Sequence, residues 1–308
     1  MNHTKCSFCN EKSVLFRRYE GRAYCEKHFL SSVERKVKRT IRKHQMLSRE
    51  DKIAVALSGG KDSTTVLYIL HLILRDWQKT KLIAITIDEG IANYKPLLIN
   101  NARKFTKSLN IPHYVFSFNK EFGKTMEMQK KRKEPCTYCG IARRYLLNKK
   151  ARELGIKKLC TGHNLDDEIE GIMMNYLKGD IFRASRVGGM VKPGTETGRK
   201  LFIPRIKPLR EVPESEIALY AQLRAQKTPD FPLNNTSLKC PYKGGLRLEV
   251  KDFLDKMEEK YPGMKFSFLE TFDKIRSYLT SSGKGVQKCE KCGEASTGKI
   301  CKTCELWR

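Results

Sequence analysis

A glycine-rich turn is the first stretch whose residue types and spacing could do chemistry. It reads SGGKDS from Ser58 to Ser63, follows an apolar run at 53–57 and precedes an apolar-striped segment at 63–76. A buried strand that leads through glycines into a helix aims backbone N–H groups and the positive end of the helix at one place, which suits a phosphate. The spacing is not GxxxxGK[ST], and a solvated turn is the alternative. We predict a nucleotide-phosphate site.

Two sets of residues near the chain ends have the spacing of metal ligands. In each set, two residues separate the members of a pair. The sets are Cys6, Cys9, Cys25 and His28, and Cys289, Cys292, Cys301 and Cys304. Two such pairs form a tetrahedral zinc site, and zinc would supply most of the folding free energy of segments too short to build a core. We therefore predict two Zn²⁺ ions, with reduced surface thiols as the alternative for the first set.

Three further cysteines form an incomplete site. Cys136 and Cys139 open a predicted helix at 137–153, where the helix dipole lowers the pKa of a thiol. Cys240 is the unpaired candidate for another ligand. Three thiolates suit an iron–sulfur cluster with one iron left open, whereas a redox dithiol, or a nucleophile with its resolving thiol, is the alternative. Cys160 lies in an apolar strand and is predicted to be a small core residue.

The elements that must position these residues alternate between strands and helices. Apolar runs predict strands at 53–57, 82–87, 113–118 and 158–161, with helices at 63–76, 97–109 and 137–153. This alternation is typical of an α/β fold with a doubly wound parallel sheet. In such a fold, ligands bind outside the carboxyl ends of the strands.

Two more stretches should lie at that carboxyl edge. The stretch from Gly162 to Glu168 follows the fourth strand, with Asn164 as a predicted helix cap. Its carboxylates suit Mg²⁺ or proton transfer, although acids are also common in a first helical turn. His163 has no partner in the sequence and is predicted to be structural. Asp88 follows the second strand, either as a ribose or magnesium contact or as an ordinary turn residue.

The remaining segments predict smaller parts. A basic helix at 31–48, capped by Ser31 or Ser32, is either a solvated linker or a contact for phosphates. A mobile basic loop is expected at 183–212, ending in a short strand at 201–203. Further helices are expected at 213–225, 246–260 and 266–280. We predict an N-terminal zinc finger at 1–30, a linker helix at 31–50, a catalytic domain at 51–245, a helical segment and linker at 246–284, and a zinc ribbon at 285–308.

The composition favours a polyanionic partner. Lys+Arg 61 against Asp+Glu 34 gives a formal net charge of +27 over 308 residues, although charge alone also serves solubility. No apolar run reaches the length of a membrane span, and no signal-peptide core is visible. We expect a cytoplasmic protein without a membrane partner, whose cysteines hold metals.

The combined motifs carry a family resemblance. The glycine turn matches the SGGxDS loop of the PP-loop ATP pyrophosphatases, which cleave ATP to AMP and pyrophosphate. With the Cys-x2-Cys pair, the lone Cys240 and the terminal zinc sets, the chain resembles the TtuA/NcsA-type tRNA 2-thiouridine synthetases from end to end. The related TtcA-type thiolases have the loop and three cysteines without the zinc modules, and lysidine synthetases have the loop without the cysteines.

The resemblance implies roles for individual residues. It implies ATP contacts at Ala56, Ser58, Gly59, Gly60, Lys61, Asp62, Ser63, Ile87, Arg143, Gly162 and Asp167. It implies a [4Fe-4S] cluster on Cys136, Cys139 and Cys240, with the fourth iron free to hold sulfide. The catalytic candidates are these three cysteines together with Lys61, Asp62 and Asp167. The resemblance also implies a homodimer.

The implied reaction is 2-thiolation of a tRNA uridine. The uridine O2 is a poor leaving group until ATP, with Mg²⁺ and Lys61, adenylates it, and sulfur then attacks C2. The uridine would be extruded, and the basic segments 33–43 and 130–133 and the zinc modules would bind RNA phosphates. The sulfur donor would be sulfide, a ubiquitin-like thiocarboxylate carrier or a desulfurase.

Three other functions stay open on the sequence alone. They are a persulfide-based thiolase without a cluster, a PP-loop ligase that transfers nitrogen, and a non-enzymatic zinc-ribbon protein that binds RNA. The first would tolerate loss of Cys240, and the second would need no iron. The third would not depend on Lys61.

Overall fold

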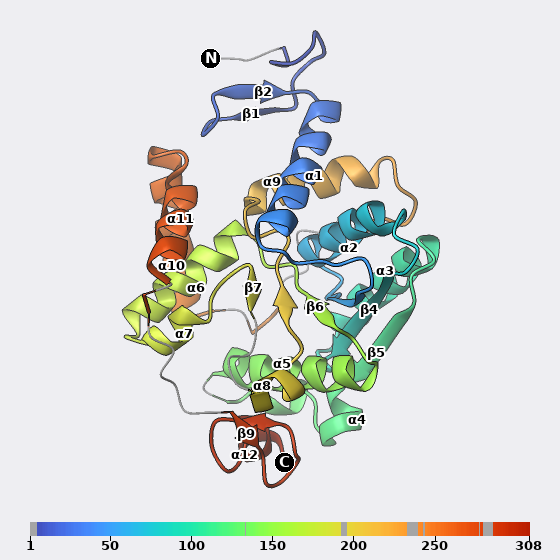
Figure 1. Ribbon diagram of the computed structural model, residues 1–308, viewed down its shortest axis with the longest axis vertical. Coiled ribbons are helices and arrows are strands. Elements are labelled where there is room, and N and C mark those ends of the chain that lie inside the picture. Colours follow the sequence, from blue (N-terminus) through green and yellow to red (C-terminus); the bar gives the residue numbers. More distant parts are fainter. Residues whose placement is uncertain are drawn as a thin grey trace.

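A six-stranded sheet forms the centre of the molecule (Figure 1). The computed structural model describes residues 5–132, 134–191, 196–232, 240–242, 244–276, 278–279 and 286–308. In spatial order the strands are β5 (His113–Ser117), β4 (Lys81–Asp88), β3 (Lys52–Ala56), β6 (Lys158–Cys160), β8 (Arg205–Ile206) and β7 (Met190–Val191). Neighbouring strands run parallel except β7, which pairs antiparallel with β8.

The strand order creates a switch point between β3 and β6. From β3 the chain moves outward through β4 to β5, and it then returns to the other side of β3 to add β6 and β8. The crevice between the loops that follow β3 and β6 is where doubly wound sheets bind ligands. The predicted parallel α/β fold is confirmed.

Helices cover both faces of this sheet. One face packs under α1 (Glu26–Lys43), α2 (Lys61–Leu74), α3 (Lys95–Ser108) and α9 (Glu214–Ala225). The other packs under α4 (Phe118–Phe122) and α5 (Pro135–Glu153), which the short 3₁₀ turn η1 (Glu127–Gln129) separates in the chain. Successive side chains of β3 point to opposite faces of the sheet. Ile53 and Val55 therefore pack into the core of the first face, and Ala54 packs into the core of the second.

The segment predicted as a loop at 183–212 contains more secondary structure than expected, and the strand predicted at 201–203 is wrong. Its described part holds the end of α7 (Ile181–Ser185), β7, α8 (Glu196–Leu201) and β8. The strand begins at Arg205 instead. Asn148 of α5 donates to Leu201 O at 2.7 Å and accepts from Ile203 N at 2.9 Å. These side-chain bonds occupy backbone groups that a strand there would need for pairing.

The first helix begins earlier than predicted. We expected Ser31 or Ser32 as its cap, but α1 starts at Glu26, and Cys25 has the extended backbone of an N-cap, with φ −73° and ψ 169°. Cys25 belongs to the N-terminal set of metal ligands, and His28 follows one turn later. The geometry of the metal set therefore fixes the start of the helix, so no capping hydroxyl is needed.

Four helices form a third cluster beside the sheet. They are α6 (Leu165–Leu177), α7, α10 (Leu246–Lys260) and α11 (Met264–Arg276). Leu165, Leu254 and Phe272 are among the buried side chains of their shared core. The helices predicted at 246–260 and near 266–280 are confirmed, with α11 beginning two residues earlier. None of the described helices, here or elsewhere, is long and apolar enough to cross a membrane.

The two terminal modules lie at opposite ends of the molecule (Figure 1). The N-terminal module is a hairpin of β1 (Leu15–Arg17) and β2 (Arg22–Tyr24), and the C-terminal module holds β9 (Gln287–Lys288), β10 (Ala295–Ser296) and α12 (Lys302–Trp307). Trp307 is 1% exposed and packs its ring 4.9 Å from that of Phe118 and 5.2 Å from that of Phe122, between centroids. Its Nε1 donates to Tyr138 O at 3.3 Å. The C-terminal module is thus docked on α4 and on the first turn of α5.

Replacing Trp307 with alanine is expected to lower the free energy of unfolding by about 3–5 kcal/mol, because a large buried ring leaves a cavity. Urea denaturation followed by circular dichroism measures the change. Phe253→Ala is the matched control, since the Phe253 ring is 54% exposed and its loss should change stability by less than about 0.5 kcal/mol. Equally small effects in both variants would contradict the docking of the C-terminal module.

Candidate nucleotide and metal sites

The glycine turn connects β3 directly to α2. Ser58 and Ser63 close it, because the Ser63 hydroxyl accepts from Ser58 N at 3.1 Å and donates to Gly60 O at 3.0 Å. Gly59 has a φ of +86°, and a Cβ there would lie 2.5 Å from Leu98 O, so only glycine fits. Gly60 is the N-cap of α2. The first N–H groups of that helix therefore stand at the carboxyl edge of β3, where a helix N-terminus favours a phosphate.

The loop after β6 lies against this turn. A Cβ on Gly162 would come within 2.8 Å of Ser63 N and 2.9 Å of the Asp62 carbonyl carbon. Asn164 Nδ2 donates to Asp62 Oδ1 at 3.1 Å. As predicted, Asn164 also caps α6, and it forms a capping box with Asp167 in which each side chain accepts from the other's backbone N–H. One asparagine thus holds Asp62 and Asp167 at the same edge.

Lys61 lies among carboxylates at this edge. Its Nζ is 3.1 Å from Asp62 Oδ2 and 2.8 Å from Glu214 Oε1, and Glu214 also binds Lys251 Nζ at 2.9 Å. Burial acts to lower the pKa of Lys61, but Asp62 and Glu214 outweigh it and raise that pKa. Burial likewise acts to raise the pKa of Glu214, yet hydrogen bonds from Lys61 and Lys251 lower it to about 2. Lys61 is therefore a fixed cation beside the phosphate cradle.

Asp167 supplies another carboxylate at the edge. Its Oδ1 lies 2.8 Å from a guanidinium nitrogen of Arg247, whose Nε lies 2.8 Å from Glu170 Oε2. Burial raises the pKa of Asp167, and Arg247 partly offsets this. Burial also raises the pKa of Asp62, and repulsion from Asp167 adds to it. A divalent cation would relieve this repulsion, so the pair fits Mg²⁺.

The next part of the edge is built by β4 and α5. Ile87 is buried near the end of β4, and Asp88 accepts from Gly90 N at 2.9 Å, which gives Asp88 the turn role that the sequence also allowed. Glu89 is buried and lies 2.9 Å from Lys95 Nζ and 3.6 Å from an Arg143 guanidinium nitrogen. The Glu89 carboxylate therefore anchors α3 and α5 together at the end of β4.

Sequence reasoning misses three charged residues of this site. Glu214 stands in a first helical turn, where acids are common for other reasons, so its pairing with Lys61 leaves no separate signal. Arg247 is one of 61 lysines and arginines with no distinguishing spacing. The sequence does contain a signal for Glu89. This residue directly follows Asp88, which the sequence already places at the carboxyl end of a strand.

The three remaining predicted ligands lie in two neighbouring segments, the start of α5 and the segment of Cys240. Cys136 opens α5 and its thiol donates to Tyr242 O at 2.8 Å, two residues beyond Cys240. Burial raises the pKa of Cys139 to about 11, with Arg143 opposing the rise and the charge of Cys240 adding to it. Burial also raises the pKa of Cys240, and the charge of Cys136 adds to this. The hydrogen bond to Tyr242 O thus brings the Cys240 segment to the start of α5, which carries Cys136 and Cys139.

This trio is more open than the two terminal sets. Among the residues that the structure describes, groups of three or more metal-ligating side chains with all ligand atoms within 4.8 Å occur only at the two termini. A single ion requires such close packing. The ligands of an iron–sulfur cluster each bind a different iron, so their sulfurs stand farther apart. The donor set of Cys136, Cys139 and Cys240 fits such a cluster.

The terminal sets fit one zinc ion each. With Zn–S bonds of ~2.3 Å, a tetrahedron places two sulfurs about 3.8 Å apart. The Sγ atoms of Cys9 and Cys25 are 3.7 Å apart, and those of Cys292 and Cys301 are also 3.7 Å apart. His28 turns Nδ1 toward the first set, 3.3 Å from Cys25 Sγ. The predicted ligand sets are brought together, and their spacing matches zinc.

Comparison with known proteins identifies the family. Residues 29–236 match the PP-loop domain family, and residues 5–30 match the N-terminal LIM domain of 2-thiouridine synthetase TtuA. The chain is similar to the tRNA 2-thiolation protein NcsA of Haloferax volcanii, with 35% identity over 98% of each chain. This chain belongs to the NcsA/TtuA group of PP-loop proteins.

Two further comparisons cover nearly the whole chain. It is 33% identical to the tRNA-5-methyluridine(54) 2-sulfurtransferase of Pyrococcus horikoshii, over 98% of this chain and 93% of the relative. It is also similar to the solved U34-tRNA thiolase NcsA from Methanococcus maripaludis with its [4Fe-4S] cluster. That match has a TM-score of 0.83 and 32% identity and covers 99% of this chain and 96% of the other. The end-to-end resemblance read from the sequence is confirmed.

Replacing Gly162 with alanine is expected to weaken ATP binding at least tenfold. The new Cβ would push the loop after β6 away from the start of α2, because Ser63 N and the Asp62 carbonyl carbon lie within 3.0 Å of it. Calorimetric titration with ATP measures the effect. Gly171→Ala is the matched control: no atom lies within 4 Å of a Cβ there, and alanine favours a helix. Equal ATP affinity in the two variants would contradict the contact between the PP-loop and Gly162.

Proposed function

We propose that this chain is a tRNA-uridine 2-sulfurtransferase, which uses ATP to replace O2 of a tRNA uridine with sulfur. The observation that carries the proposal is that α5, which carries Cys136, Cys139 and Arg143, is anchored through Glu89 at the carboxyl end of β4. The positive charge of Arg143 lies near enough to act on Cys139 and on Arg247, which binds Asp167. Relatives named for tRNA 2-thiolation and 2-sulfurtransferase activity support it, as does the solved NcsA with its [4Fe-4S] cluster.

ATP would bind along the edge formed by β3, β4 and β6. Ala56 and Ile87, near the ends of two neighbouring strands, offer apolar surface to the adenine. The PP-loop and the start of α2 supply N–H groups to the phosphates. Asp62 and Asp167 would hold Mg²⁺, and Lys61 would stabilise the charge that develops on the departing pyrophosphate. The ATP contacts predicted from the resemblance are retained here as the proposed binding set.

The reaction balances with ATP, a tRNA uridine and sulfide. The uridine O2 attacks the α-phosphorus, the bond to pyrophosphate breaks, and the proton on uridine N3 is released. In the alternative role that the sequence allowed it, Asp167, whose pKa burial raises, would accept that proton instead of binding Mg²⁺. Sulfur then bonds to C2, the C2–O2 bond breaks, and AMP leaves with the uridine oxygen. No oxidant or reductant is required.

Cys136, Cys139 and Cys240 would hold the cluster. A three-cysteine [4Fe-4S] cluster supplies an iron without a protein ligand, the chemistry that keeps sulfide available beside the activated uridine. The charge of Arg143 acts on Cys139 and Cys240 and would reduce the repulsion between these thiolates and the phosphates of ATP. Tyr242 O, which accepts from the Cys136 thiol, ties the Cys240 segment to the start of α5.

Several further expectations become part of this proposal. The terminal sets would each hold Zn²⁺, the sulfur donor would be sulfide or a ubiquitin-like thiocarboxylate carrier, and the enzyme would act as a cytoplasmic homodimer. The domain boundaries at 30, 50, 245 and 284 stay a prediction. Of the basic segment 130–133, Lys133 lies outside the described residues.

Cys240→Ala is expected to lower the iron and labile-sulfide content of anaerobically purified protein and to reduce 2-thiouridine formation more than a hundredfold. ATP affinity should be unchanged, because Cys240 is not among the proposed ATP contacts. Iron and sulfide assays and mass spectrometry of tRNA nucleosides provide the readouts. Cys160→Ala is the control, since that thiol is buried within β6. If Cys240→Ala retained thiolation, a persulfide-based reaction on Cys136 or Cys139 would replace the cluster in this account.

A further inference from the structure

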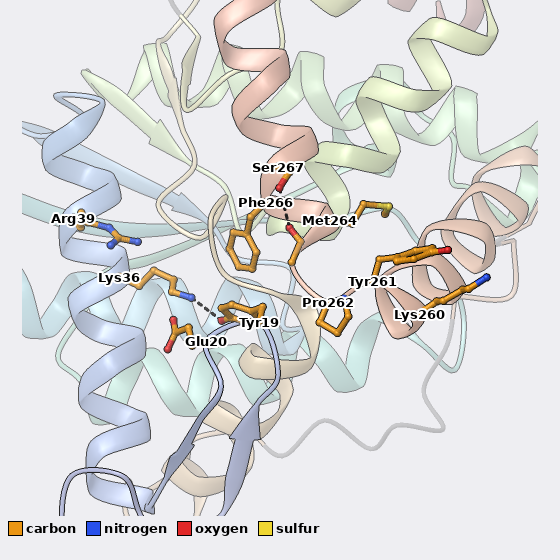
Figure 2. Close-up of a pocket in the computed structure, with 11 residues that line it drawn as sticks. Tyr19, Glu20, Lys36, Arg39, Lys260, Tyr261, Pro262, Met264, Phe266 and Ser267 are labelled. Atoms are coloured by element: carbon orange, nitrogen blue, oxygen red, sulfur yellow. Dashed lines mark hydrogen bonds between the residues drawn. The ribbon is translucent and has the colours of Figure 1, made fainter.

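An open groove lies between the N-terminal module, α1 and the turn that joins α10 to α11 (Figure 2). The volume of this open groove is about 670 Å³, which lies in the range of small-molecule sites. Its walls are aromatic and basic and include Tyr19, Lys36, Arg39, Lys260, Tyr261 and Phe266. None of these residues belongs to the PP-loop edge or to a metal set.

The groove presents aromatic rings to solvent. Tyr261 is 51% exposed, so its ring is accessible to a stacking base. Tyr19 and Phe266 pack against each other, with 4.6 Å between ring centroids. Lys260 Nζ lies 5.2 Å from the centroid of the Tyr261 ring, so a cation and a ring are offered together. Such combinations bind the bases and phosphates of single-stranded nucleic acid without sequence preference.

A buried cation lies at the base of the groove. Lys36 is 8% exposed, donates to Tyr19 OH at 2.8 Å and lies 5.1 Å from the centroid of the Phe266 ring. Burial lowers the pKa of Lys36, with the carboxylate of Glu216 opposing the fall. A phosphate in the groove would bring a negative charge to this ammonium and offset the cost of its burial.

The charge around the groove favours an anion. Glu20 also lines it, but that carboxylate already binds Arg17 at 3.1 Å and accepts from Tyr24 OH at 2.6 Å. Arg39 is exposed, and Arg35 and Lys38 are exposed on the same helix. The groove therefore continues into the basic surface of α1, which can follow a phosphate backbone.

The far wall of the groove is tied to the nucleotide edge. Met264 and Phe266 line it, while Lys265, between them, is buried and lies 2.5 Å from Asp166 Oδ1. Asp166 precedes Asp167 in α6 and also accepts from Glu214 N at 2.7 Å. An occupant of the groove would thus be held against the element that carries Asp167.

We propose that this groove binds an unpaired stretch of the substrate tRNA, with one nucleotide stacked on Tyr261 beside Lys260 and the neighbouring phosphates held by Lys36 and Arg39 across the groove (Figure 2). This deepens the proposed function, on which it rests for the identity of the RNA. The bound nucleotide is distinct from the uridine that reacts, because the groove contains no PP-loop or cysteine residue. Its capture orients the tRNA before the target uridine enters the catalytic edge.

Fluorescence anisotropy with labelled tRNA tests the groove directly. Tyr261→Ala should weaken tRNA binding about 5–150-fold, the range found when a stacked base loses its aromatic partner. Tyr261→Phe should restore binding, since the ring alone stacks. Arg39→Ala should lower the slope of log K against log salt concentration by about 0.7–0.9, which is one phosphate contact. In steady-state thiolation, Tyr261→Ala should raise the KM for tRNA with kcat and ATP affinity unchanged.

Phe253→Ala is the control for surface changes on α10, because its exposed ring does not line the groove. The proposal is overturned if Tyr261→Ala binds tRNA as tightly as Phe253→Ala does. It is also overturned if Tyr261→Ala loses affinity for a thiocarboxylate carrier protein and keeps its affinity for tRNA. If the native chain binds tRNA through Tyr261 but forms no 2-thiouridine, the groove stands and the proposed function fails.

Discussion

The contact between Gly162 and the start of α2 is the constraint on which the rest of the site depends. It exists because β6 returns to the sheet beside β3, so the loops that follow these two strands meet at one edge. A side chain at Gly162 would meet Ser63 N at 2.8 Å and push those loops apart. Asn164 then holds Asp62 from one side of the contact and Asp167 from the other. The backbone contact at Gly162 thus positions the PP-loop, and the side-chain amide of Asn164 positions the carboxylates of Asp62 and Asp167.

Charged groups connect this edge to the other parts of the molecule. Lys265 of α11 binds Asp166 at the start of α6. Arg210 is fully buried and lies 2.7 Å from Asp273 Oδ2 of α11 and 3.4 Å from Glu168 Oε2 of α6. Breaking one partner of such a pair costs about 3–5 kcal/mol, because the other charge stays buried. The start of α11, which lines the proposed RNA groove, is therefore held against the catalytic edge.

The sequence predicts the parts of this protein whose signals are local. The PP-loop, the Asn164 cap, the two terminal sets of metal ligands and most helices are encoded within short stretches, and the structure places them as expected. One error arises where a distant residue decides, because Asn148 takes the backbone groups of the strand expected at 201–203. The other arises at a metal ligand, because Cys25 stands at the N-cap of α1 in place of the expected serine. Glu214 and Arg247 were missed because their partners Lys61 and Asp167 come from segments 153 and 80 residues away. The groove joins three separate segments, so no spacing reveals it.

The central claim is that the PP-loop edge activates the uridine O2 itself, so that sulfur displaces AMP from C2. Transfer of an ¹⁸O label tests this most directly, with tRNA transcribed from uridine triphosphate that carries ¹⁸O at O2. Mass spectrometry of the AMP and the nucleosides should find one ¹⁸O in AMP for each 2-thiouridine formed, and none in pyrophosphate. Unlabelled AMP together with 2-thiouridine would contradict the account, because the oxygen would then have left by another route.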